Sequence, residues 1–115
     1  MYRFSYAEIA EDSASESRKR EQDLFERAIR LMQVAQGTPA QSPQTIEAFV
    51  FVQRLWTVLM KDLCEPENGL PDTLKAGLLS IGLWVMRESD AIVRGEKNDL
   101  AALIEINSAI CEGLK

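Results

Sequence analysis

The sequence predicts an all-α protein, a single-domain bundle of about four helices. Four segments carry the apolar periodicity of amphipathic helices, and the three breaks between them each hold a glycine, a proline or both. No segment sustains the alternation of apolar and polar residues that is typical of strands. A chain of 115 residues is long enough for one core, so residues 1–115 are expected to form one domain, with residues 1–13 as a candidate N-terminal arm.

The first helix is expected over about residues 14–36, and an earlier start is the alternative. Acid-first pairs at i,i+4, such as Glu16–Arg20, support it. Upstream of Leu24 the apolar stripe fades, so this half of the helix is expected to project from the core or to fray. The stripe itself consists of Leu24, Ala28, Leu31 and Ala35, widened by Phe25, Ile29 and Met32.

The second helix is expected over about residues 44–63, with Ser42 as N-cap and Pro43 in its first turn. Its apolar arc covers roughly 200°, which is wider than a helix with one buried face needs. Such a helix either lies at the centre of a bundle or shares its extra face with a partner. Trp56 lies within this arc and is expected to be at least half buried.

The third helix is expected over about residues 72–94, and it carries two apolar stripes. A short connection to the preceding helix favours an antiparallel hairpin, so these two helices form the predicted central pair. Gly77 and Gly82 are expected to permit close approach of a neighbouring helix, with Gly77 beside Trp84 on the helical wheel. The main stripe is Leu74, Leu78, Ile81, Val85 and Ile92, and the second is Leu79, Leu83 and Met86.

The fourth helix is expected over about residues 99–112, with Asn98 as N-cap and Gly113 as C-cap. Asn107 falls in the centre of its apolar stripe. A buried amide without a partner would cost about 1–3 kcal/mol, so Asn107 is expected to form a hydrogen bond to another helix. A contact with a ligand is the alternative interpretation.

Charge and composition disfavour several function classes. The net charge is −5, and the one basic cluster, Arg18-Lys19-Arg20, is flanked by glutamates, so DNA binding is not expected and direct RNA contact is disfavoured. The chain has no histidine, and Cys64 and Cys111 lack metal-ligand spacing, so we expect two reduced, buried cysteines. No catalytic, cofactor-binding or metal-binding motif is present, and an enzyme is not expected.

Hydropathy predicts a cytoplasmic protein. No apolar run approaches the roughly 20 residues that span a bilayer, and the segment from Met1 to Tyr6 has no apolar core of a secretory signal.

Four segments, in this order and spacing, resemble the FlaF family of alphaproteobacterial flagellar biosynthesis regulators. The resemblance covers essentially the whole chain. The segments are YRFSYAEI at residues 2–9, FVQRLW at 51–56, LSIGLWVMRE at 79–88, and LIEIN with GLK at 103–107 and 113–115.

The resemblance implies a role in flagellin synthesis and secretion, opposite the translation repressor FlbT. One hypothesis is a cytosolic chaperone, similar to those of type III secretion, that binds amphipathic flagellin helices without a cofactor. The alternative is a post-transcriptional regulator of flagellin mRNA that acts with or against FlbT. Flagellin is therefore the expected partner, and FlbT a second candidate.

Two apolar features exceed what an isolated bundle needs. They are the second stripe of the third helix, which is Leu79, Leu83 and Met86, and the N-terminal residues Tyr2, Phe4, Tyr6 and Ile9. Either the arm packs on the stripe, or a flagellin helix occupies this surface. Large apolar patches are rarely left open on soluble monomers, which favours the first interpretation.

Overall fold

The computed structural model describes the backbone of residues 6–113 and the side chains of residues 16–113. The helices in this range are α1 (Tyr6–Ala35), α2 (Pro43–Leu63), α3 (Asp72–Val93) and α4 (Leu100–Gly113). Residues 6–113 contain no strand. The predicted all-α, four-helix fold is confirmed.

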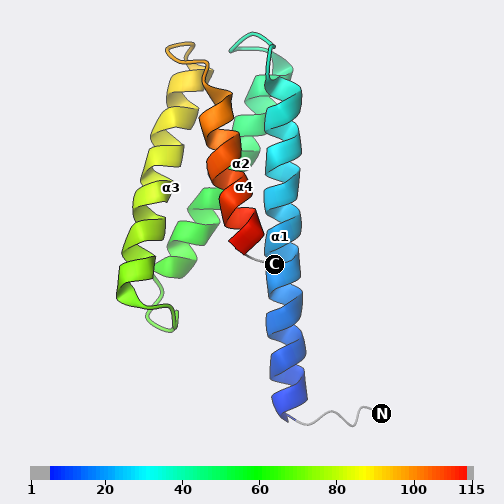
Figure 1. Ribbon diagram of the computed structural model, residues 1–115, viewed down its shortest axis with the longest axis vertical. Coiled ribbons are helices and arrows are strands. Elements are labelled where there is room, and N and C mark those ends of the chain that lie inside the picture. Colours follow the sequence, from blue (N-terminus) through cyan, green and yellow to red (C-terminus); the bar gives the residue numbers. More distant parts are fainter. Residues whose placement is uncertain (1–5, 114–115) are drawn as a thin grey trace.

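Consecutive helices run in opposite directions, so α1 and α3 ascend in Figure 1 while α2 and α4 descend. The most extensive helix–helix contact joins α2 and α3, which confirms them as an antiparallel pair. α1 packs against both α2 and α4, whereas α3 and α4 touch only sparsely. α2 therefore lies between α1 and α3, and its outward side is bordered by both.

Local sequence explains where the helices end. Gly37 and Gly95 follow α1 and α3 with φ of 81° and 79°, in the left-handed region that glycine adopts without strain. Ser42 caps α2 by accepting a hydrogen bond from the Thr45 amide. The cap of α4 is one residue later than predicted, because the helix begins at Leu100 and the Ala102 amide donates to Asp99 rather than to Asn98.

The first half of α1 projects beyond the other helices, as its faded apolar stripe predicts (Figure 1). The helix begins at Tyr6, so the earlier of the two expected starts is the observed one. Its buried positions are Phe25, Ala28, Met32 and Ala35. Leu24, placed in the stripe by the sequence, is 42% exposed. The face of α1 turned toward both α2 and α4 is centred on Phe25 and Ala28, so Leu24 lies at its margin.

Trp56 occupies the centre of the core, where all four helices meet. Its side chain is fully buried, and the Phe25 ring meets it edge-on with centroids 5.8 Å apart. From α4, the fully buried Asn107 accepts a hydrogen bond from Trp56 Nε1 at 2.8 Å. Asn107 Nδ2 donates to the Leu103 carbonyl at 2.7 Å, so the amide is satisfied at both ends. The expected hydrogen bond between helices is present.

Close approach of α2 and α3 depends on Gly82 and not on Gly77. A Cβ at Gly82 would lie 2.5 Å from Met60 Sδ and 3.2 Å from Trp56 Cε3, whereas a Cβ at Gly77 would meet nothing within 4 Å. The expectation for Gly77 is therefore wrong. Gly77 lies in the first part of α3, and α4, with 14 residues, ends near mid-bundle, so no helix covers that side (Figure 1).

The same short α4 leaves Leu74, assigned to the main stripe of α3, 48% exposed. The cysteines also differ from expectation. Of the two, only Cys111 is buried. Cys64 forms the C-cap of α2 and is exposed, because the chain turns away from the core there.

Candidate partner-binding face

Exposed apolar side chains gather on the outward side of α2 and its two neighbours. On α2, Val50 is 46% and Val58 is 68% exposed. They lie two turns apart on one side of the helix, with Arg54 between them. We refer to the surface formed by these residues and the hollows beside them as the α2 face.

Two shallow hollows lie between α1 and α2. The first is formed by Leu24 of α1 with Phe51, Arg54, Leu55 and Val58 of α2. The second, one turn further along, is formed by Arg27, Leu31, Glu47, Val50, Phe51 and Arg54. Most of their lining surface is apolar, and the charged side chains that contribute to it are exposed, an arrangement that suits side chains of a docked helix.

A third hollow lies between α2 and α3. Met86 of α3 forms one wall, and the other lining residues belong to α2: Val50, Gln53, Arg54, Thr57 and Val58. The two helices are tied beside it by a hydrogen bond of 2.8 Å that Gln53 Nε2 donates to Asp90 Oδ1. Arg54 lines all three hollows, so they form one continuous surface around it.

The predicted second stripe of α3 borders this surface. Leu83 is 59% exposed, while Leu79 and Met86 are partly buried. The N-terminal residues lie elsewhere. Tyr6 and Ile9 belong to the projecting part of α1, of which the structure describes the backbone, and Tyr2 and Phe4 lie outside the described residues. Within residues 6–113, α1 and α3 make no contact, so the structure does not bring the stripe and this part of α1 together.

The sequence alone does not identify α2 as the centre of this face. On a helical wheel Arg54 lies on the narrow polar side of α2, whereas Val58 lies in the apolar arc. The signal was present, because an arc of roughly 200° exceeds what one buried face requires. What the wheel could not show is that Val58 stays exposed while Val52 and Trp56, in the same arc, are buried.

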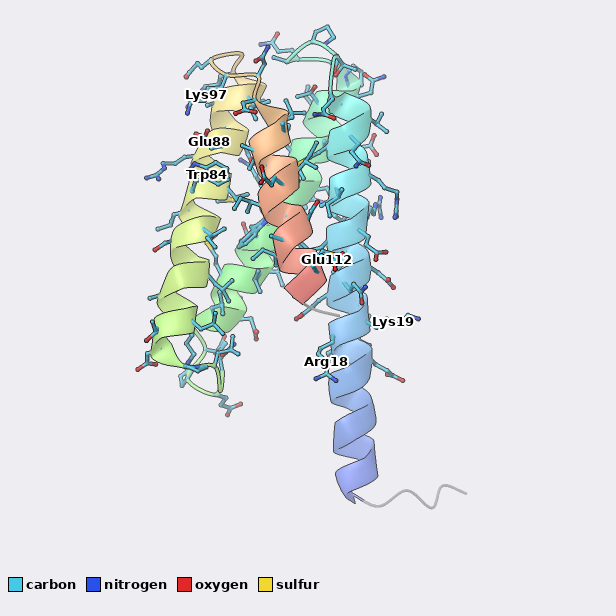
Figure 2. The ribbon with its side chains drawn as sticks, viewed as in Figure 1. Arg18, Lys19, Trp84, Glu88, Lys97 and Glu112 are labelled. Atoms are coloured by element: carbon cyan, nitrogen blue, oxygen red, sulfur yellow. The ribbon has the colours of Figure 1, made fainter. Side chains whose placement is uncertain are left out.

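A separate hollow lies where α3 and α4 make their sparse contact. Trp84, which Figure 2 labels on α3, lines it together with Ser80, Ile81 and Ile106. Trp84 is partly buried and packs against the core. Near the end of α3, Glu88 forms a salt bridge of 2.8 Å with Lys97 Nζ. This salt bridge links α3 to the loop that precedes α4.

One carboxyl group has a shifted pKa. Burial, together with the nearby negative charge of Asp62 on α2, raises the pKa of Glu21 on α1 above its ordinary value. Glu21 is partly buried. The described residues contain no group of side chains that could hold a metal ion. None of the helices in the described range has the length and hydropathy to span a bilayer.

Comparison with known proteins identifies the family. The family model described as "Flagellar protein FlaF" matches residues 2–114. The chain belongs to the FlaF family. FlaF proteins are flagellar proteins and are not known as enzymes. Neither a curated protein nor a solved structure matches this FlaF chain. The α2 face and the core around Trp56 both lie within the FlaF match.

Proposed function

We propose that this FlaF-family protein is a cytoplasmic flagellin chaperone that promotes flagellin synthesis and secretion during flagellum assembly. The proposal places an amphipathic flagellin helix on the α2 face. The observation that carries it is the exposed apolar surface around Val50 and Val58, continued by Leu24 and Leu83 on the flanking helices.

The shape and chemistry of this face favour a helix as ligand. Contiguous apolar patches on soluble proteins mark interaction sites. Three adjoining shallow hollows suit successive side chains of an amphipathic helix better than one small molecule, which prefers a single deep pocket. Met86 at the α3 side provides a flexible, polarisable surface that adapts to irregular apolar partners.

The experiment compares Leu83→Asp and Val58→Asp with Leu74→Asp in a binding assay with purified flagellin monomer. Leu74 is a matched control, because it is also an exposed leucine of α3 but points about 180° away from Leu83. Circular dichroism establishes that all three variants are folded.

We expect Val58→Asp and Leu83→Asp to weaken flagellin binding at least about tenfold, which corresponds to about 1.4 kcal/mol. The Leu74→Asp variant should bind like the wild type. Unchanged binding in both face variants would exclude the α2 face, and a wild-type protein that fails to bind flagellin would exclude the chaperone function.

The alternative function, regulation of flagellin mRNA with or against FlbT, has one supporting observation. Arg18, Lys19 and Arg20 are exposed on the projecting part of α1, where Figure 2 labels the first two. Against it, Arg20 forms a salt bridge of 3.9 Å with Glu16, which partly neutralises the cluster. The net charge of −5 also opposes binding to the phosphates of RNA. Salt-dependent binding of flagellin leader RNA without FlbT would support this alternative. Its absence, together with flagellin binding, would exclude direct contact with RNA.

A further inference from the structure

The α2 face carries positive charge on a protein that is acidic overall. Its lining includes two arginines, Arg27 and Arg54, and one carboxylate, Glu47. Among residues 16–113, neither arginine forms a salt bridge. The whole chain has thirteen basic residues against eighteen acidic ones, so this local excess of cations is unusual for it.

Each of the two arginines lies next to apolar side chains of the α2 face. The Arg27 guanidinium lies over the Phe51 ring at 4.8 Å from its centroid, a cation–π contact that holds the charge beside the hollows. Arg54 stands between Val50 and Val58 and lines every hollow of the face. Any helix that fills these hollows must cover the Arg54 side chain.

Covering an arginine removes it from water, and this desolvation opposes binding unless the partner supplies an acceptor. A carboxylate is the best match, because a guanidinium donates two parallel hydrogen bonds to it. A lysine of the partner at the same place would add repulsion to the desolvation. The face therefore discriminates between amphipathic helices by the charges beside their apolar stripe.

We propose that the α2 face selects an amphipathic helix whose apolar side chains fill the hollows and whose adjacent carboxylates pair with Arg54 and Arg27. The inference rests on the proposed function in using the same face. It adds the chemistry of the bound segment, which is acid-flanked rather than basic.

The test uses synthetic helical peptides of about 20 residues, about 30 Å long. Two peptides carry the same leucine stripe, flanked in one by glutamates and in the other by lysines. Fluorescence anisotropy measures their affinity for the wild type, Arg54→Glu and Arg18→Glu. The last variant is a matched control, because it makes the same change of charge on the projecting part of α1, outside the hollows.

We expect the glutamate peptide to bind the wild type at least about tenfold more tightly than the lysine peptide at low ionic strength, and added salt to narrow this ratio. Arg54→Glu should invert the preference, and Arg18→Glu should preserve it. Equal affinities for the two peptides would overturn the inference, as would an equal effect of Arg18→Glu and Arg54→Glu.

The peptide experiment and the flagellin-binding experiment can fail independently of each other. If charge selection fails while Val58→Asp still abolishes flagellin binding, the chaperone function stands and only the inferred chemistry is wrong. A second copy of the chain is the competing occupant. Analytical ultracentrifugation tests for it. If the wild type is a dimer and Val58→Asp is a monomer, the face is occupied by a second copy and the inference is overturned.

Discussion

Replacement of Asn107 by leucine tests whether the core is organised around the hydrogen bond between α2 and α4. In the wild type, Trp56 Nε1 donates to Asn107 Oδ1 at 2.8 Å, and both side chains are fully buried. Leucine removes the acceptor of the indole N–H and leaves that donor buried. The Leu103 carbonyl, by contrast, retains its backbone partner in α4, so its loss of Asn107 Nδ2 matters less.

A buried donor without a partner costs about 1–3 kcal/mol, so we expect Asn107→Leu to lower the free energy of unfolding by about 2 kcal/mol. For a domain of this size that corresponds to a decrease in Tm of about 8 °C. The opposite outcome, a more stable protein with looser helix register, would follow if Asn107 left no buried partner behind. The buried Trp56 N–H decides for destabilisation.

Urea denaturation followed by far-ultraviolet circular dichroism measures the effect, with Glu105→Ala as an exposed control on the same helix. A double-mutant cycle with Trp56→Phe isolates the hydrogen bond, because the double variant leaves neither partner unpaired. We expect a coupling energy of about 1–2 kcal/mol. If Asn107→Leu changes stability by less than about 0.5 kcal/mol, or if the two substitutions are additive, the hydrogen bond does not organise the core.

Three further predictions concern stability. Gly82→Leu should destabilise the protein by about 1–3 kcal/mol through overpacking against α2. The same replacement at Gly77 should stabilise it by about 0.5–1 kcal/mol, because leucine favours the helix more than glycine does. The melting temperatures of the two variants should therefore shift in opposite directions. Ser42→Ala should lower the free energy of unfolding by about 1 kcal/mol, because it removes the cap of α2. If the variant melts at the same temperature as the wild type, the cap is dispensable. Glu21→Gln should raise Tm at neutral pH, because a carboxyl group with a raised folded-state pKa destabilises the fold once it is ionised. Its advantage should vanish as the pH falls below the ordinary glutamic acid pKa, and a pH-independent difference would mean that ionisation is not the cause.

Much of the fold follows from local sequence. Apolar periodicity places all four helices with their ends within a few residues, except for the early start of α1 at Tyr6. Gly37, Gly95 and Ser42 terminate or begin helices for reasons that reside in their own backbone and side-chain chemistry. The place of Asn107 in an apolar stripe likewise predicts a buried and satisfied amide, because an unpaired one would be too costly.

The candidate site depends on information that no single helix contains. A helical wheel gives the angles between side chains but not which neighbour covers each side. α2 is bordered by α1 and α3, and its Val58 stays exposed although it belongs to the same apolar arc as the buried Trp56.

The choice between two glycines has the same origin. Gly82 meets Met60 across the α2–α3 contact, while Gly77 lies where the short α4 no longer reaches, and nothing in their local sequence separates them. The sequence by itself therefore determines the helices, their ends and the family. The tertiary structure decides which apolar side of each helix is buried, because burial depends on the lengths and positions of the helices that pack against it.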